Sequence, residues 1–263
     1  MQTLNLQQVC VVISIGLLAC TKEVNISTAE DVPLKPKIEK ELKHCEITRI
    51  VGYEPFLPSP RVFTFEYNSK GDPTSITPTL ISTGSPKHEF RYDRKGRLTD
   101  YIGPYDNGFF EFWHVYRYDN KDRIVSDSVY IFGKYGETPS NDFPSLRRFI
   151  TYEYDAKNRI KKATTVLTTG SSVDEYDYDN DGNRMVPGVA YDDNPNPLRT
   201  NSIWMFLNRD YSVNNPWSTA AYNDNGLATT LVVPHNRFFI VGSLFPQFIE
   251  YSCKGGHGNG NNN

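Results

Sequence analysis

Long hydrophobic runs, an excess of basic charge and familiar catalytic motifs are all missing from this sequence of 263 residues. Its most apolar stretch, Val9–Ala19, is shorter than the about 20 residues that a membrane-spanning helix needs. The formal net charge is −3 and no basic stripe stands out, so we expect no nucleic-acid partner. The Gly-x-Ser-x-Gly and Gly-x-x-x-x-Gly-Lys motifs do not occur, so the sequence has neither a serine-hydrolase elbow nor a phosphate-binding loop.

Metal-ligand spacing is also scarce. The five histidines never fall at His-x-His or His-Glu-x-x-His spacing, and His114 is interpreted as a core or rim histidine. Asp177, Asp179 and Asp181 match the opening of a calcium loop, but its twelfth position is Gly188 instead of glutamate. We therefore favour a plain turn there, with calcium as the alternative, and expect no metal and no cofactor.

What the sequence does contain is a repeat. The pattern aromatic-x-Tyr-Asx-x-x-Gly-Arg-Leu is clearest at Phe90–Leu98 and recurs, with drift, in six copies. The turn-opening positions are Asn68, Asp93, Asp119, Asp155, Asp179 and Asn223. Three residues later the copies have Gly71, Gly96, Asp122, Asn158, Gly182 and Gly226. An Asx residue opens a type I turn, and Gly, Asn and Asp best tolerate the left-handed backbone that follows it, so each copy predicts a hairpin.

The aromatic residues of each copy lie two positions apart and therefore share one face of a strand. Aromatic residues make up 13% of the chain, which favours strands over helices. We predict an all-β fold of consecutive antiparallel hairpins in one curved sheet, and leave open whether it closes into a barrel. Two inserts lengthen the repeats, at Gly133–Pro144 and Pro187–Ser218. In the second insert, Ile203–Tyr211 has the apolar spacing of one short helix, which we expect to plug one end of the sheet.

The repeat unit resembles the YD repeat of the RHS family, whose repeats form long sheets of β-hairpins. The resemblance covers Phe65 to about Leu227. Six irregular copies are too few for the shell that full-length RHS proteins wind around a toxin. The chain is more similar to small bacterial lipoproteins with a YD-like domain of unknown function. This resemblance implies a hairpin sheet and transfers no catalytic residues.

The N-terminus predicts a lipid anchor. Residues 1–19 are typical of a lipoprotein signal peptide, because Leu17-Leu18-Ala19-Cys20 resembles a lipobox, although Met1–Gln8 has no basic residue. The alternative is a buried apolar strand. Cys20 would carry the lipid and place the protein at the outer membrane, with cell-surface or periplasmic exposure undecided. Residues 20–44 are expected to form a tether, in which Thr21-Lys22-Glu23 is either an export tag or plain linker.

A single β domain is predicted for residues 45–254, followed by a disordered tail at 255–263. Cys45 and Cys253 stand at the two ends of this domain. In an oxidising compartment an isolated pair usually forms a disulfide, and two buried free thiols are the alternative. A bridge would place the first and last strands side by side.

Two function classes fit these observations. The first is a membrane-anchored, non-catalytic binding module for a glycan or a peptide, which the aromatic richness and the tether favour. The second is a glycan or peptide hydrolase with its site between the inserts. A pocket with a His–carboxylate pair or two carboxylates would favour the enzyme, whereas a shallow aromatic groove would favour binding.

Overall fold

The computed structural model describes residues 45–54, 59–232 and 244–253. In these residues one sheet of 13 antiparallel strands carries a single α-helix, α1 (Ser202–Asn208), and the short 3-10 helices η2 (Pro144–Leu146) and η3 (Pro197–Thr200). The expected signal peptide, tether and tail, including Cys20, lie outside the described residues. No helix of the described part of the chain has the length and apolar character to span a membrane.

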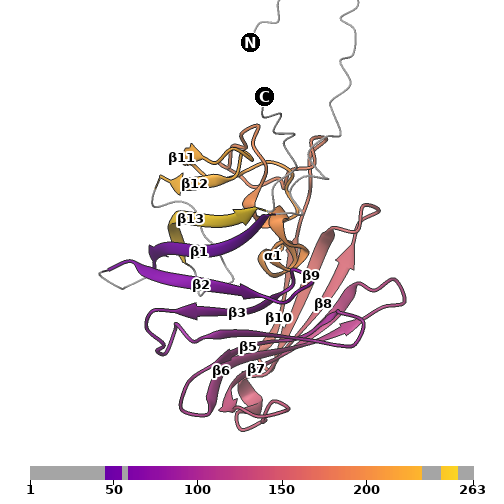
Figure 1. The fold of residues 1–263 in the computed structure, drawn as a ribbon. Coiled ribbons are helices and arrows are strands. Elements are labelled where there is room, and N and C mark those ends of the chain that lie inside the picture. Colours follow the sequence, from indigo (N-terminus) through magenta and orange to yellow (C-terminus); the bar gives the residue numbers. More distant parts are fainter. Residues whose placement is uncertain (1–44, 55–58, 233–243, 254–263) are drawn as a thin grey trace, which may run out of the picture. The chain divides into compact units, whose positions relative to one another are not determined.

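The strands run in a meander. They are β1 (Cys45–Tyr53), β2 (Arg61–Tyr67), β3 (Pro73–Pro78), β4 (His88–Tyr92), β5 (Leu98–Pro104), β6 (Phe109–Tyr118), β7 (Ile124–Lys134), β8 (Arg148–Tyr154), β9 (Ile160–Leu167), β10 (Gly170–Glu175), β11 (Thr219–Tyr222), β12 (Ala228–Leu231) and β13 (Phe245–Cys253). Each strand from β1 to β9 pairs with the next, β11 pairs with β12 and β12 with β13, and β13 returns to pair with β1 (Figure 1). The all-β prediction is confirmed. The sheet is open, with β10 and β11 at its two edges, so the barrel that the sequence left open does not form.

The repeat turns hold the hairpins together through their own side chains. In the second copy the Asp93 carboxylate accepts hydrogen bonds from the backbone N–H groups of Lys95 and Arg97, both at 2.9 Å. Asn68, Asp119, Asp155 and Asn223 accept the equivalent pair of bonds. The residues at the left-handed position all have positive φ, between 55° at Asp122 and 88° at Gly182. The fifth copy makes this turn but only an isolated bridge, Tyr178 to Arg184, in place of two paired strands.

Tyrosine hydroxyl groups tie each repeat to the one before it. The tyrosine that precedes the turn donates to the carbonyl of the residue that opens the previous return strand. Tyr118 donates to Leu98 at 2.8 Å and Tyr154 to Ile124 at 2.7 Å, and the bond from Tyr178 to Ile160 is longer, at 3.5 Å. Tyr92 donates in the same way to Pro73, at 2.6 Å, and Tyr67 donates to Ile47 within β1, at 2.8 Å. Burial raises the pKa of Tyr118 to about 12, so its hydroxyl keeps its proton at neutral pH.

The arginine that follows the turn also connects neighbouring repeats, through an ion pair in its own repeat and a ring contact in the next. Arg97 pairs with Asp93 of its own turn, while its guanidinium lies over the Tyr118 ring of the next repeat, 4.8 Å from the centroid. Arg123 over Tyr154 and Arg159 over Tyr178 repeat the arrangement at 4.9 and 3.8 Å. Aromatic, tyrosine, Asx and arginine positions of the motif therefore each have a separate physical task.

Helix α1 lies on one face of the sheet. Trp204 is fully buried and meets the rings of Phe65 on β2 and Phe90 on β4 edge-on, both at 5.7 Å. Phe206 meets Tyr116 on β6 and Tyr152 on β8 at 5.4 and 5.2 Å. One short helix can reach strands this far apart in the sheet only if the sheet curves around it (Figure 1). The helix ends at Asn208, earlier than the predicted Tyr211. It covers the concave face of the sheet, whereas we expected it to plug one end.

The convex face carries a smaller core. Ile102, Phe110 and Trp113 form it, and Tyr135 of the first insert packs against it. Arg91 lies over the Trp113 ring at 4.8 Å and donates to the Gly136 and Glu137 carbonyls of that insert. The first insert therefore covers the convex side, on the other face of the sheet from α1.

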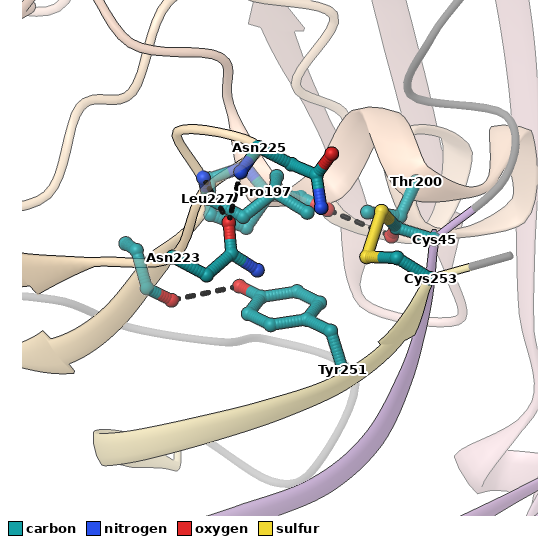
Figure 2. The surroundings of a disulfide bond; sticks show 9 residues. Cys45, Pro197, Thr200, Asn223, Asn225, Leu227, Tyr251 and Cys253 are labelled. Carbon is teal, nitrogen blue, oxygen red and sulfur yellow. Dashed lines mark hydrogen bonds between the residues drawn. A yellow bond between two sulfur atoms is a disulfide. The ribbon is translucent and has the colours of Figure 1, made fainter. Parts of the chain in front are cut away.

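A disulfide joins Cys45 on β1 to Cys253 on β13, with a Cα–Cα distance of 3.9 Å (Figure 2). The two cysteines are directly opposite each other in the register of the strand pair. Leu227 is buried beside them, and the nearby Tyr251 hydroxyl donates to the Ala228 carbonyl at 2.9 Å. The bridged strands lie side by side within the sheet, with β2 on one flank and β12 on the other, instead of at a barrel seam.

Candidate functional site

Beyond the C-terminal end of α1, the same face of the sheet is hollow. A cavity of about 360 Å³, the concave cavity, lies over strands β4 to β8. Its wall consists of aromatic and aliphatic side chains with a few polar groups. Its polar and aromatic lining residues are His88, Tyr101, Glu111, Phe112, His114, Arg148 and Arg209. Tyr101 and Phe112 have ring centroids 5.0 Å apart and form a broad aromatic surface.

Two further hollows adjoin the concave cavity. The inner chamber, of about 150 Å³, shares Tyr101, His114 and Arg209 with it and adds Asp127 and Tyr152. The outer recess, of about 620 Å³, shares Arg209 and lies against β10. Because shared side chains line them, the three hollows follow one another along the concave face.

A histidine–carboxylate pair stands between the concave cavity and the inner chamber. His114 Nδ1 on β6 is 2.8 Å from Asp127 Oδ2 on β7. The Tyr152 hydroxyl approaches the same carboxylate oxygen at 3.4 Å. Asp127 is buried, and its Oδ1 atom has no hydrogen-bond partner within the described residues. The pairing engages one imidazole nitrogen and leaves Nε2 as the polar atom that His114 can offer to a ligand.

A second histidine lies deeper in the wall. His88 Nδ1 is 2.7 Å from the Tyr101 hydroxyl, and the two rings stack with centroids 5.6 Å apart. Burial lowers the pKa of His88 to about 3, so this imidazole is neutral at physiological pH. Burial also raises the pKa of Tyr101 well above its usual value. His88 Nε2 finds no partner among the residues described. The wall therefore contains polar groups that a purely structural core would avoid.

Arg209 lines all three hollows. It is the C-cap of α1 and has a φ of 50°, in the left-handed region where glycine is usual. Its Nη1 atom donates to Asp174 at 3.1 Å and to the Tyr176 hydroxyl at 3.2 Å. Its guanidinium lies 5.7 Å from the centroid of the Tyr152 ring. The helix end thus directs a positive charge toward the cavity.

The charges at the cavity are partly compensated. Glu111 accepts a hydrogen bond from the Gly84 backbone N–H at 2.7 Å and another from the Tyr105 hydroxyl. One oxygen of the Asp127 carboxylate is paired with His114, and the other has no hydrogen-bond partner within the described residues. Arg148, exposed on β8, lines the cavity, and no ion pair joins it to a carboxylate in the described ranges.

Of the residues singled out from the sequence, His114 lies at these hollows and the others lie elsewhere. Cys45 and Cys253 form the disulfide, and Cys20 is outside the described residues. Asp177, Asp179 and Asp181 do not assemble as ligands, and no group of three His, Cys, Asp or Glu side chains suited to a metal occurs in the part of the chain that the structure describes. Of the repeat turns, Gly96, Asp122 and Asn158 line another cavity, of about 280 Å³, beside α1.

Sequence reasoning missed the pairing of His114 with Asp127. A signal for it was present in the repeat turn between β6 and β7. That hairpin pairs Tyr118 with Ile124 and, by its register, Tyr116 with Asp127. Asp127 is then the diagonal neighbour of His114 on the same face. Arg209 had no comparable signal, because its position depends on how the second insert folds back.

No protein-family model matches the chain. The solved structures that are similar in part include two with low sequence identity. A porin-like protein from Bacteroides uniformis is 12% identical, with a TM-score of 0.43, and the match covers 79% of this chain and 98% of that one. A chain of the TcdB2-TccC3-Cdc42 complex is 14% identical, with a TM-score of 0.27, over 66% of this chain and 9% of that one. At these identities and scores the similarities carry no inference about function.

Proposed function

We propose that this protein is a lipid-anchored binding module that holds a small glycan or peptide ligand in the concave cavity. The anchor would be the lipid on Cys20, at the outer membrane. The observation that carries the binding function is the cavity itself. Its volume of about 360 Å³ lies in the range of about 300–1,000 Å³ typical of ligand sites. An apolar wall with a few convergent polar groups is also typical of such sites.

A structural role alone accounts poorly for this wall. Around α1 the concave face is filled by large rings such as Trp204 and Phe206. Beyond the helix the same face carries His88, His114 and Asp127. Burying polar groups that lack partners costs free energy, so an apolar filling would stabilise the fold better. Polar groups at that place are instead useful for recognising a ligand.

The test is binding by the full-length protein. Glycan and peptide arrays identify a ligand, and titration calorimetry then measures its Kd. Ile131→Trp places a large ring in the cavity, whereas Tyr130→Trp alters the adjacent residue on the opposite face of β7. We expect the first variant to weaken binding by about tenfold or more and the second to leave it unchanged. Equal effects of the two variants, or no ligand on either array, would contradict the proposal.

A second candidate function is the hydrolysis of a glycan or a peptide. It is favoured by the His114–Asp127 pair, because a histidine oriented by a carboxylate is the usual form of a general base. Its place would be the concave face, and not a cleft between the inserts. For a peptide, the described residues that line the concave cavity and inner chamber include no serine, threonine, cysteine or lysine that could act as nucleophile. For a glycan, hydrolysis needs two carboxylates, and Glu111 and Asp127 are the two that line these hollows.

Turnover distinguishes the two candidates. If the pair is catalytic, His114→Gln lowers kcat by about 10²- to 10⁴-fold, the usual contribution of a general base, and changes Kd little. If the protein only binds, the wild type releases no product from the ligand found on the arrays. Product formation that His114→Gln abolishes would replace the binding proposal with the hydrolase.

A further inference from the structure

We infer that two copies of this protein associate through the edge strand β10. In this dimer β10 pairs with β10 of the second copy in antiparallel orientation, so that one sheet continues across both copies. Val173 lies at the centre of the pair, on the two-fold axis. The inference concerns the edge of the sheet and does not depend on the concave cavity or its ligand.

The first support is the open backbone of β10. All six residues of this strand are exposed, and its only strand partner among the described residues is β9. The β9–β10 hairpin pairs Gly170 with Leu167 across a two-residue turn. Alternate residues of β10, starting with Ser171 and Val173, therefore direct their N–H and C=O groups away from β9. Unpaired groups along a sheet edge are a template for another strand.

The two edges of the sheet differ in how well they are protected. β11 has only four residues, and its register with β12 shifts at two places. β10 pairs with β9 in an unbroken register and contains no proline or lysine, which natural edge strands use to prevent pairing. It has two acidic residues. Asp174 is already paired with Arg209 at 3.1 Å. Glu175 is opposite Lys162 in the register. The edge at β10 is therefore the one that can accept a strand.

An apolar band on the convex face reaches this edge. Ile150 belongs to the core of the concave face, so Phe149, which precedes it, lies on the convex face. Phe149 is directly opposite Val166 on β9, and Val173 on β10 is the diagonal neighbour of Val166. The three side chains are 42%, 47% and 52% exposed, in that order. A continuous band of half-exposed apolar side chains is typical of an interaction surface.

A second copy fits this edge because the band then continues into its own counterpart. With Val173 on the two-fold axis, the two Val173 side chains meet, and Ser171 of each copy is opposite Glu175 of the other. These are the residues whose backbone groups point outward, so they can exchange hydrogen bonds between the copies. Asp174 is then opposite Ser172, so no like charges face each other directly. The contact is self-complementary, as a two-fold interface requires.

The size of the contact sets its strength. Only the six residues of β10 and their neighbours take part, which places the interface below about 1,200 Å², in the class of weak and transient contacts. We therefore expect a dimer with a Kd on the order of 1–100 μM in solution. The proposed lipid anchor would favour the dimer further, because it holds both copies at one membrane and raises their effective concentration.

Cysteine cross-linking in membranes tests the geometry in the full-length protein. Val173→Cys places two thiols across the two-fold axis, where the Cα atoms of a hydrogen-bonded antiparallel pair are about 5.5 Å apart and within reach of a disulfide. Ala221→Cys, on the opposite edge strand β11, is the matched control. After oxidation with copper phenanthroline, we expect about fivefold or more linked dimer for Val173→Cys than for Ala221→Cys on non-reducing electrophoresis.

Sedimentation equilibrium of the purified full-length protein in a mild detergent measures the association itself. Val173→Lys places two ammonium groups directly opposite each other and should raise the Kd of the dimer about tenfold or more. Val189→Lys changes another exposed valine and should leave the Kd unchanged. Ser171→Pro is a second disrupting variant, because it removes an outward N–H group from β10 and spares the pairing with β9. Melting temperatures show whether the variants fold.

The outcomes separate this inference from the proposed function. A protein that stays monomeric up to about 100 μM, with equal cross-linking from Val173→Cys and Ala221→Cys, overturns the dimer. A dimer that survives both Val173→Lys and Ser171→Pro uses another surface and also overturns the inference. Neither result affects ligand binding in the concave cavity, which the arrays test independently.

Discussion

A side chain that tolerates positive φ poorly should lower the free energy of unfolding when it is placed at the left-handed position of the repeat turn. Gly96 has φ of 80°, and a Cβ atom there would meet nothing closer than Lys70 Nζ at 3.7 Å. Gly96→Val therefore tests backbone strain without a clash. We expect it to lower the free energy of unfolding by about 1–2 kcal/mol, measured by urea denaturation.

The matched change is Asn158→Gly at the same position of another copy, where φ is 59°. Glycine relieves the strain but loses the exposed hydrogen bond from Arg123 to the Asn158 side chain, which is long at 3.3 Å. These effects oppose each other, so stability should change by less than about 0.5 kcal/mol. Equal losses at Gly96 and Asn158 would rule out a common turn.

The tyrosine hydroxyl groups that hydrogen-bond between repeats should make the free energy of unfolding fall at high pH. Tyr118→Phe removes the bond to the Leu98 carbonyl and should cost about 1 kcal/mol at neutral pH. The folded-state pKa of Tyr118, about 12, lies above the unfolded value of about 10. Its contribution is thus complete below pH of about 10 and is lost as pH rises toward about 12. Urea denaturation at several pH values should show wild type and variant converging over that interval. A constant difference would contradict this role for the hydroxyl.

At the scale of elements, α1 packs against the concave face through Trp204 and Phe206. Trp204 contacts the rings of Phe65 on β2 and Phe90 on β4, and it is fully buried from solvent. Trp204→Ala should cost about 3–5 kcal/mol, the usual loss for a large buried ring. Ile203→Ala, at a half-buried neighbour, is the control and should cost clearly less. Denaturation curves for both variants decide whether the helix is a structural part of the core.

The pairing of β1 with β13 depends on the disulfide for part of its stability. The bridge closes a loop with a sequence separation of 208 residues. In the chain-entropy model such a loop stabilises the fold by about 4–5 kcal/mol, and measured values are often smaller. Reductant should therefore lower the melting temperature. Mass spectrometry of the unreduced protein should show the Cys45 and Cys253 peptides joined, whereas two alkylatable thiols would contradict the bridge.

The elements differ in how far the sequence predicts them. Hairpins follow from the turn chemistry and the two-residue aromatic spacing, which act within about ten residues, and the all-β prediction succeeded for that reason. The place of β13 beside β1 has no local cause. Only the pair Cys45 and Cys253 predicted it, through the expected disulfide. The crossing of the concave face by residues 176–218 had no such signal, and there Trp204 and Phe206 pack against rings from four strands. The site is likewise a product of that crossing, because Arg209 meets His114 and Tyr152 only after it.

At the scale of the whole molecule, the expected lipid anchor on Cys20 would hold the protein, and with it the concave cavity, at the membrane. Cys20→Ala should release the protein from the membrane fraction or leave an uncleaved precursor, because position 20 then has no thiol to carry the lipid. Fractionation with immunoblotting measures both. Cys10→Ala, within the expected signal peptide, is the control and should fractionate as wild type does. If Cys20→Ala also matures and fractionates normally, the lipoprotein interpretation is wrong.

The pairing of the first and last described strands also affects the order in which the sheet can form while the chain is synthesised. From β1 to β10 every new strand finds its partner immediately before it in the chain, so this part of the sheet can grow during translation. β1 has its second neighbour only when β13 has left the ribosome. Until then its outer edge is an open template for other chains. The strand pair that ends up inside the sheet is the last to form, and a chain truncated before β13 should be the species most prone to aggregate.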